Sequence, residues 1–285
     1  MRPLKEQVIL ITGATDGLGK AVAMQLAHTG ATLLLHGRDE ARGQQTLKEI
    51  RARTGNTRLF WYRADFVALA QVRALAERLA REQERIDVLV NNAGIGTTLP
   101  GGGARQESED GYELRFAVNY LAPFLLTRLL LPTLRRSAPA RIVNVSSAGQ
   151  APLDFRDIML EHHYTGVQAY SQSKLALVMF TFDLAEELAG TGVTANCLHP
   201  ATYMPTKMVL AARGSSVSTI EEGVRATTHL ITASELDQVS GRYYNGLREA
   251  RAERQAYDRQ ARRRLRQLSE QLTSLAGPEK GGDIR

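Results

Sequence analysis

The sequence contains a single cysteine, Cys197, which excludes a disulfide within the chain. Such sparse use of cysteine is typical of reducing compartments, so we expect a cytoplasmic location. We find no apolar run near the roughly eighteen residues that predict a membrane span, and membrane association is not expected. Met1, Arg2 and Pro3 lead directly into a strand-like segment, so we also expect no signal peptide.

Positive charge is concentrated in one stretch of the chain. The net charge is +6, yet residues 248–266 alone hold eight arginines against three acidic residues. The rest of the chain is almost neutral, whereas nucleic-acid enzymes more often spread basic residues over a whole face. We therefore expect no nucleic-acid partner. His162, His163, Cys197 and His199 lack partners at metal-ligand spacing, so we also expect no metal site.

Strand-like and helix-like segments alternate along the chain, and 43% of the residues are hydrophobic, enough for a sizeable core. Such alternation predicts a parallel sheet with helices on both faces. We therefore expect one doubly wound α/β domain of the Rossmann type over residues 1–246, with about seven strands. The expected helices include residues 18–29, 39–54 and 108–135, and one that ends near Glu84. The expected strands are Val8–Ile11, Thr32–His36, Leu59–Tyr62, Ile86–Val90, Arg141–Ser147, Val193–Leu198 and Gly241–Tyr244.

Residues 247–285 are predicted to form a basic amphipathic helix and a tail after this domain. Apolar residues recur there every three or four positions, which is the pattern of a helix with one apolar stripe. The stripe favours docking on the domain or across a homo-oligomer, and a membrane-surface helix is the alternative. Its members are Tyr257, Ala261, Leu265, Leu268, Leu272 and Leu275.

Tyr170 and Lys174 lie four residues apart in a helix-forming stretch, so both side chains project from one helix face. A positive charge near a tyrosine favours the phenolate and lowers the tyrosine pKa from its usual value of about 10. The pair therefore suits general acid/base catalysis near neutral pH. Most such pairs are only neighbours on a surface, so this interpretation depends on further motifs.

Three further motifs each follow a strand-like run. Thr12–Gly19 lies between a strand and a helix, and its glycines allow the backbone to approach a pyrophosphate at the helix N-terminus. Asn91–Gly94 offers small residues and amides that suit the approach of a ribose or a nicotinamide. Ser146 and Ser147 end another buried strand with hydroxyl groups. An ordinary turn is the alternative for each motif taken alone.

Together and in this order, the four motifs resemble the short-chain dehydrogenase/reductase family over about Gln7 to Tyr244. The long gap between Ser147 and Tyr170 and the arginine-rich C-terminal helix are similar to its retinol-dehydrogenase-like branch, which includes bacterial oxidoreductases. The resemblance implies hydride transfer between a nicotinamide cofactor and a carbonyl or alcohol substrate. A catalytically silent nucleotide-sensing or scaffold protein is one alternative. A lyase or epimerase that uses bound NAD is the other.

The resemblance also implies roles for individual residues. Tyr170 would exchange a proton with the substrate oxygen, and Ser147, which matches the family serine better than Ser146, would bind that oxygen. Lys174 would lower the tyrosine pKa and bind the nicotinamide ribose, and Asn119 would support a water-linked proton relay. The residues implied in cofactor binding are Gly13, Thr15, Asp16, Gly17, Leu18, Gly19, Arg38, Asp65, Phe66, Asn92, Ala93, Gly94, Tyr170, Lys174 and Pro200.

Cofactor choice is expected to depend on the end of the second strand. Gly37 stands where NAD-preferring relatives usually carry aspartate, and Arg38 can pair with a 2′-phosphate. This favours NADP, with NAD as the alternative, although Asp16 stands where many NADP enzymes carry a basic residue. Asp39 fits the N-cap of the next helix. Thr206 sits one position later than the family threonine that contacts the carboxamide.

Three segments interrupt the alternation, at residues 97–105, 148–169 and 201–218. Each follows the carboxyl end of a strand, where open α/β sheets bind ligands, so we expect them to form the substrate pocket. Gly101, Gly102 and Gly103 predict that the first is a mobile loop. The apolar residues of the other two favour an apolar substrate, and packing of the segments onto the domain is the alternative. These residues are Leu153, Phe155, Ile158, Met159, Tyr203, Met204 and Met208.

Overall fold

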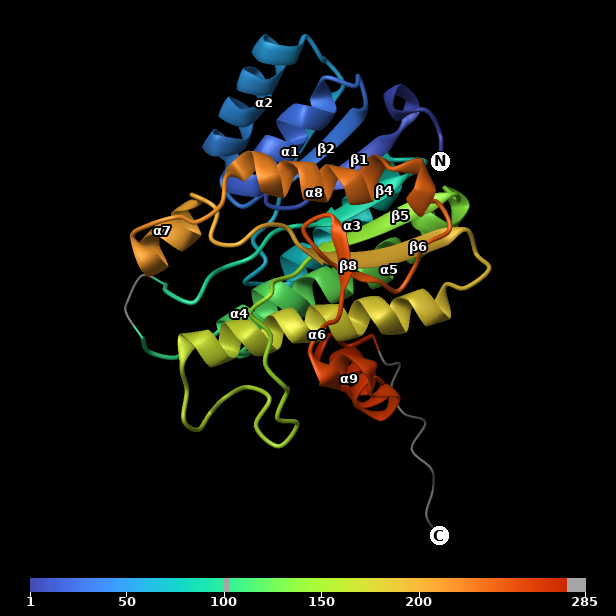
Figure 1. Cartoon of the computed structure of the whole chain (residues 1–285). Coiled ribbons are helices and arrows are strands. Elements are labelled where there is room, and N and C mark those ends of the chain that lie inside the picture. Colours follow the sequence, from blue (N-terminus) through green and yellow to red (C-terminus); the bar gives the residue numbers. More distant parts are fainter. Residues whose placement is uncertain (100–102, 276–285) are drawn as a thin grey trace.

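A computed structural model describes residues 1–99 and 103–275 of the chain. They form one sheet in the order β3-β2-β1-β4-β5-β6-β7-β8, with helices on both faces (Figure 1). Gly101, Gly102 and residues 276–285 of the predicted tail lie outside the described residues. The strands are β1 Val8–Ile11, β2 Thr32–Gly37, β3 Leu59–Arg63, β4 Val88–Asn91, β5 Ala140–Val145, β6 Val193–His199, β7 Tyr243–Asn245 and β8 Arg248–Ala250.

The sheet changes its winding direction at β1, which pairs in parallel with β2 on one side and with β4 on the other. Pairing remains parallel from β3 to β7, so the carboxyl ends of these strands meet at one edge of the sheet. The crevice at such a reversal is where doubly wound folds bind their ligands. The predicted doubly wound fold is therefore confirmed.

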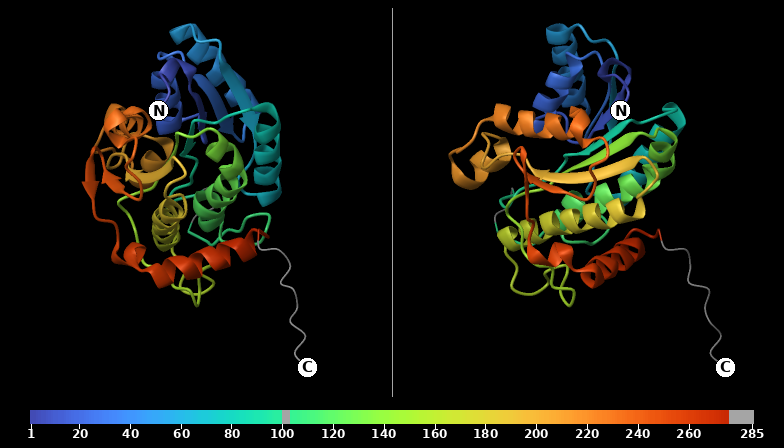
Figure 2. Two further views of the ribbon diagram at one scale, coloured as in Figure 1. Left: turned by 90° about the vertical axis from the view of Figure 1, so that its right-hand side faces the viewer. Right: turned by 45° about the vertical axis from the view of Figure 1, so that its right-hand side comes forward.

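The helices form two layers, each with its own hydrophobic core. Helices α1, α2 and α8 cover one face, while α3, α5 and α6 cover the other, with α9 packed outside α6 (Figures 1 and 2). Short 3-10 turns occur at η1 Leu4–Glu6, η3 Ser234–Leu236 and η4 Arg254–Tyr257. The helices are α1 Gly17–Ala27, α2 Glu40–Thr54, α3 Leu69–Glu82, α4 Leu114–Phe116, the π-helical turn η2 Ala117–Leu121, α5 Ala122–Arg136, α6 Gly166–Glu187, α7 Lys207–Arg213, α8 Ile220–Thr232 and α9 Arg259–Leu272.

Two elements differ from the sequence-based prediction. An eighth strand, β8, pairs antiparallel with β7 after a turn at Gly246, which has a positive φ of 60°. The helix expected over residues 108–135 begins only at Leu114, because the Glu113 carboxylate accepts a hydrogen bond from the Phe116 amide and caps that helix. The expected N-cap at Asp39 is present, since its carboxylate accepts from the Arg42 amide at 3.0 Å.

The apolar stripe of α9 packs against the domain that precedes it (Figure 2). Leu265 is 1% exposed, and Ser269 lies beside the hydroxyl of Tyr120 with an oxygen–oxygen distance of 2.6 Å. Two arginines on the same helix bind acids of α6: Arg262 contacts Glu186 at 2.6 Å and Arg266 contacts Asp183 at 2.9 Å. The stripe is thus occupied within the chain. The division at Gly246 stays a prediction, and β8 continues the sheet beyond it.

One helical run, Leu114–Arg136, has the length and composition of a membrane span, contrary to the expectation that no apolar run approaches that length. Since 83% of its most apolar window is buried inside the fold, this run is a core helix.

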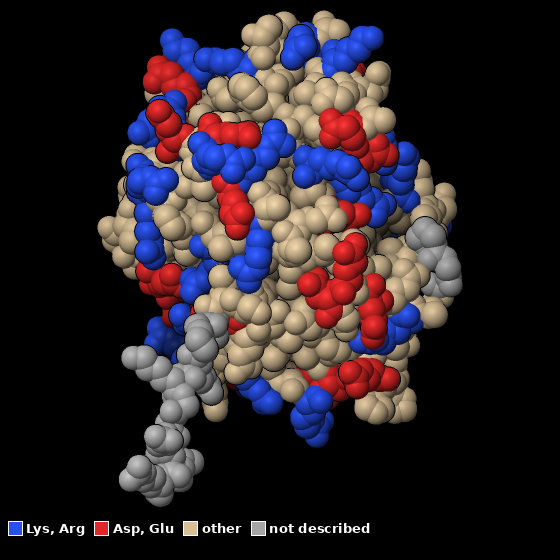
Figure 3. Space-filling view, turned by 180° about the vertical axis from the view of Figure 1, so that it is seen from behind, with Lys and Arg blue, Asp and Glu red and all other residues tan. Residues whose placement is uncertain are grey.

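The face seen in Figure 3 carries acidic side chains interspersed among the basic ones.

Candidate active site

The glycine turn after β1 lies directly against the turn after β4. Gly13 has a φ of +67°, and a Cβ atom there would come within 2.8 Å of the Ala93 Cα. At Gly19 a Cβ would lie 2.3 Å from the Gly13 oxygen and 2.4 Å from the Asn92 amide nitrogen. Asn92 Nδ2 in turn donates to the Thr12 carbonyl at 2.8 Å. Glycine is therefore required at both positions, because the turn after β4 and the backbone of the glycine turn itself occupy the space that a side chain would need.

Asn119 lies in the π-helical turn η2 and fixes the chain after β4. Its Oδ1 accepts from the Ile95 amide at 2.7 Å, and its Nδ2 donates to the Ile95 carbonyl at 3.1 Å and to Ser173 Oγ at 3.0 Å. Gly94 leaves room for this arrangement, since a Cβ there would lie 3.0 Å from Asn119 Oδ1 and 3.5 Å from Lys174 Nζ. Such π turns occur frequently at functional sites.

Ser147, Tyr170 and Lys174 come together at the carboxyl end of β5. Burial raises the pKa of Tyr170, and a hydrogen bond with the Ser147 hydroxyl opposes that increase. Lys174 is 5% exposed, its Nζ donates to the Val145 carbonyl at 3.0 Å, and burial lowers its pKa to about 8. Its Nζ lies 5.8 Å from the centre of the Tyr170 ring. The lowering interaction at Tyr170 comes from Ser147, and the lowering of the tyrosine pKa by Lys174 stays a prediction.

Ser146 has a different environment from Ser147. It is 4% exposed and its hydroxyl donates to the Lys174 carbonyl at 2.8 Å, so it attaches α6 to the end of β5. The Ser147 Oγ accepts from the Gly149 amide at 3.0 Å. Of the two hydroxyls, that of Ser147 is the one beside the Tyr170 phenol.

The ends of β2 and β3 carry two neighbouring cations. Arg38 is exposed directly after β2, and Arg63 Nε donates to the Arg38 carbonyl at 3.2 Å. Arg63 pairs in register with Gly37 at the end of the adjacent parallel strand. The sequence could have identified this second arginine only if the register of the two strands had been known. A Cβ on Gly37 would lie 2.7 Å from the Trp61 ring, so this ring occupies the space that a side chain there would need.

Asp16 caps α1 and links the glycine turn to two cations. Its carboxylate accepts from the Gly17 amide at 2.8 Å and contacts Arg42 at 2.8 Å and Lys207 at 3.1 Å. These hydrogen bonds outweigh burial and hold its pKa below the usual value. Lys207 is the first residue of α7, so Asp16 attaches this short helix to the glycine turn. Thr206 caps α7 through the Val209 amide at 3.3 Å.

His36 joins two expected cofactor segments and was not identified from the sequence. Its ring stacks on Phe66 at 4.3 Å between centroids, its Nε2 lies 3.1 Å from the Ala64 carbonyl, and its Nδ1 accepts from the Gly13 amide at 3.4 Å. Burial lowers the His36 pKa to about 4, so the ring is neutral and donates through Nε2. Asp65 caps the following turn at the Val67 amide, 3.2 Å away.

A buried ion pair supports the segment after β4 and was also not identified from the sequence. Arg115 is 2% exposed and Glu113 is fully buried. Arg115 donates to the Gly96 and Thr97 carbonyls, both at 2.8 Å, and to the hydroxyl of Tyr164. These contacts hold residues beside Gly94 against the start of α6.

The remaining predicted positions have the following surroundings. Leu18 is 7% exposed and packs in the core beneath α8, Thr15 lies against Gly37, and Pro200 is buried after β6. Among the predicted pocket residues, Leu153 and Ile158 are buried in the α6 core and Met204 in the opposite core. Phe155 and Met159 pack at the edge of the first core, whereas Met208 lies against Gly96 and Tyr203 is 43% exposed.

A family model described as short chain dehydrogenase matches residues 7–215. The chain belongs to the short-chain dehydrogenase family. This dehydrogenase is 38% identical to retinol dehydrogenase 13 of Mus musculus, with 95% of this chain and 84% of that one covered. The predicted family and its retinol-dehydrogenase-like branch are therefore confirmed, and the protein is an NAD(P)-dependent oxidoreductase.

Two solved structures are similar to this dehydrogenase. A protein from Mycobacterium paratuberculosis is 31% identical with a TM-score of 0.77, covering 94% of this chain and 93% of that one. A short chain dehydrogenase from Escherichia coli CFT073, complexed with NADPH, is 26% identical with a TM-score of 0.69, covering 85% and 97%. Within residues 1–99 and 103–275, no group of three His, Cys, Asp or Glu could hold a metal ion.

Proposed function

We propose that the protein is an NADP-dependent oxidoreductase that interconverts an apolar carbonyl compound and its alcohol. The observation that carries the proposal is the meeting of Ser147, Tyr170 and Lys174 beside the glycine turn at the reversal of the sheet. Asn119 joins this group through Ser173 and Ile95. The bound nicotinamide supplies or accepts the hydride.

The side chains have distinct tasks in this mechanism. The hydroxyls of Ser147 and Tyr170 donate to the substrate oxygen and stabilise the negative charge that develops on it. Tyr170 then transfers its phenolic proton to that oxygen during reduction, or removes it during oxidation. The charged form of Lys174 would bind the nicotinamide ribose and would favour the phenolate of Tyr170 once its proton has been transferred. Asn119 holds the helical turn through which this relay reaches solvent.

NADP is proposed as the cofactor because Arg38 and Arg63 stand at the ends of the adjacent strands β2 and β3, and a guanidinium group can pair with the adenosine 2′-phosphate. The ring of Trp61 fills the space above Gly37 that an NAD-selective aspartate would need. The NADPH complex of the Escherichia coli relative supports the same choice. The remaining cofactor contacts are proposed at the glycine turn, Asp65, Phe66, the Asn92–Gly94 segment and Pro200.

An apolar substrate is proposed because the segments around the site are apolar and the curated relatives include retinol dehydrogenases. Met208, which lies against Gly96, and Tyr203, which is exposed after β6, are the described side chains that we propose to contact it. A long-chain or isoprenoid aldehyde fits this description. A cytoplasmic location, the absence of a nucleic-acid or membrane partner and a possible homo-oligomer stay predictions.

The test is turnover with NADPH and with NADH against a panel of aldehydes, ketones and alcohols. Tyr170→Phe preserves the ring but removes the transferable proton, so we expect turnover to fall at least about 10²-fold with little change in NADPH affinity. Near-normal turnover of this variant would overturn the mechanism. A silent scaffold would bind NADPH without consuming it, and a lyase or epimerase would convert substrate without net cofactor consumption.

A further inference from the structure

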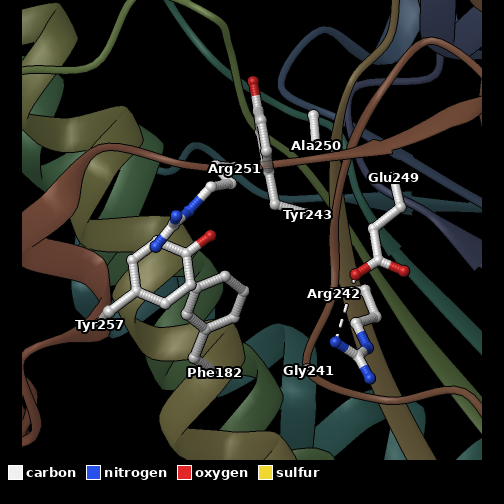
Figure 4. A pocket seen from close by; sticks show the side chains of 8 residues that line it. All are labelled: Phe182, Gly241, Arg242, Tyr243, Glu249, Ala250, Arg251 and Tyr257. Carbon is white, nitrogen blue, oxygen red and sulfur yellow. Dashed lines mark hydrogen bonds and ion pairs between the residues drawn. The ribbon is translucent and has the colours of Figure 1, made fainter.

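The main-chain carbonyl of Ser147 receives hydrogen bonds from two side chains. Gln150 Nε2 donates to it at 2.8 Å, and the Tyr243 hydroxyl donates at 3.1 Å. Tyr243 is 4% exposed, and Figure 4 shows its phenol extending away from Phe182 and Arg242, which line the same pocket as Tyr243. A residue of the last parallel strand therefore reaches the backbone of the proposed catalytic serine.

The chain that follows Tyr243 holds the second donor in place. The Glu253 amide donates to Gln150 Oε1 at 2.9 Å, which leaves the Gln150 amide group directed at Ser147. Two residues later, Gln255 accepts from the Leu153 amide at 2.7 Å and donates to its carbonyl at 3.1 Å. The segment from β7 to η4 thus forms a continuous set of contacts with the residues that follow Ser147.

We propose that Tyr243 and Gln150 are positioning residues that orient the Ser147 hydroxyl toward Tyr170. Two donors on one carbonyl restrict rotation of the Ser147–Ala148 peptide plane, and the Gly149 amide restrains Oγ on the other side at 3.0 Å. The hydroxyl then stays within hydrogen-bonding reach of the Tyr170 phenol and of a substrate oxygen. This inference rests on the proposed function.

The Tyr243 hydroxyl is suited to constant donation. Burial raises the pKa of Tyr243 to about 12, so the hydroxyl keeps its proton over the whole range in which the enzyme is assayed. A positioning role therefore predicts a lower kcat with an unchanged shape of the pH profile. A direct role in proton transfer would instead move one limb of that profile.

The first experiment compares Tyr243→Phe with Tyr244→Phe in the full chain. Tyr244 is the next residue of β7, and its ring packs in the core on the other face of the sheet. We expect Tyr243→Phe to lower kcat about fivefold to tenfold, with the dissociation constant for NADPH within about twofold of wild type. We expect Tyr244→Phe to retain the wild-type kcat.

A double-mutant cycle decides whether the effect passes through Ser147. In a Ser147→Ala background, Tyr243→Phe should cause no further loss of the residual rate, because the hydroxyl that it orients is gone. Gln150→Leu acts on the same carbonyl and provides a second variant if Tyr243→Phe folds poorly. Its loss of kcat should likewise disappear in that background.

Four outcomes separate the hypotheses. A wild-type kcat for both Tyr243→Phe and Gln150→Leu overturns the positioning role, and so does an equal fold-loss with and without Ser147. A general loss of NADPH affinity in both variants would show a structural role instead. Wild-type turnover of Ser147→Ala itself would overturn the proposed function, whatever the other variants show.

Discussion

Burial shifts the pKa values of Tyr170 and Lys174 in opposite directions, because it disfavours the charged form of each. The Tyr170 phenol is thereby kept protonated, while the Lys174 ammonium becomes easier to deprotonate. Because the Ser147 hydroxyl stabilises the phenolate, it sets how readily the tyrosine can release its proton. At pH 7 the lysine is charged, and it loses its charge as the pH rises through about 8.

This shift predicts pH-dependent cofactor binding. If the Lys174 ammonium binds the ribose, the affinity for NADPH should weaken as the pH rises through about 8, where the ammonium loses its proton. Lys174→Met should bind NADPH more weakly at pH 7, show no such pH dependence, and also lose kcat. Fluorescence titration from pH 6 to pH 9 measures the affinity and its pH dependence, and steady-state kinetics measures kcat. Lys48→Met, an exposed lysine of α2, is the control, and an effect on binding or on catalysis alone would contradict the dual role.

Cofactor selectivity provides a second prediction at the residue scale. Arg38→Ala and Arg63→Ala should each raise the KM for NADPH about tenfold to a hundredfold and leave the KM for NADH nearly unchanged. Each variant loses a charge-assisted hydrogen bond to the 2′-phosphate. Arg53→Ala removes an exposed arginine from the other end of α2 and should change neither constant. Equal effects on the two cofactors would show that these arginines do not bind the 2′-phosphate.

At the scale of elements, α9 supports α6, the helix that carries Tyr170 and Lys174, from outside. Its arginines bind Asp183 and Glu186 near the end of α6, while its apolar side packs on the same core. Tyr170 and Lys174 belong to the second and third turns of α6, and α9 holds the later turns of the same helix. The C-terminal helix thereby contributes to the rigidity of the site.

The packing of α9 predicts a measurable loss of stability. Leu265→Ala should lower the free energy of unfolding by about 2–4 kcal/mol, because it leaves a cavity at a side chain that is 1% exposed. Leu247→Ala removes the same atoms from a side chain that is 44% exposed and should cost less than about 0.5 kcal/mol. Chemical denaturation of both variants makes the comparison. Similar losses in the free energy of unfolding for the two variants would show that the apolar stripe of α9 does not pack in the core.

The elements that the sequence predicted are those with a local signal. The spacing of Tyr170 and Lys174 and the glycines after β1 are visible in a few consecutive residues. Strand β8 is not visible in this way, since the sequence Arg248-Glu249-Ala250 has little strand propensity and pairs only because β7 presents a free edge. The place of Arg63 beside Gly37 can be found only from the register of β2 and β3. The contact of Tyr243 with Ser147 can be found only when the positions of β5 and β7 in the sheet are known.

At the scale of the whole molecule, His36 couples global stability to pH. It lies beneath the glycine turn and is neutral in the folded protein, since burial lowers its pKa from 6.5 to about 4. Below pH 6.5 the unfolded chain gains a proton that the folded protein does not bind, so stability falls as the pH decreases from about 6.5 to about 4. Below the lower value both states are protonated and this contribution stays constant.

The expected size of this effect is about 3 kcal/mol. His36→Asn retains an acceptor for the Gly13 amide but cannot titrate, so it should show a smaller loss of stability over the same pH interval. Urea denaturation at pH 7, 5.5 and 4.5 measures the difference. His162→Asn, an exposed histidine, is the control. Parallel pH curves for wild type and His36→Asn would show that His36 is accessible to protons in the folded state.

The π-helical turn at Ala117–Leu121 places the amide of Asn119 by means of one surplus residue in a helical turn. Loss of a single codon from this stretch would restore a regular α-helix and rotate everything before it by about 100° relative to α5. Asn119 would then no longer meet Ile95 and Ser173. The buried side chains of Glu113 and Arg115, which precede the turn, would be displaced as well, so we expect such a deletion to disturb the site together with the packing around it. The number of residues in this segment is therefore as necessary for assembling the site as the amide of Asn119.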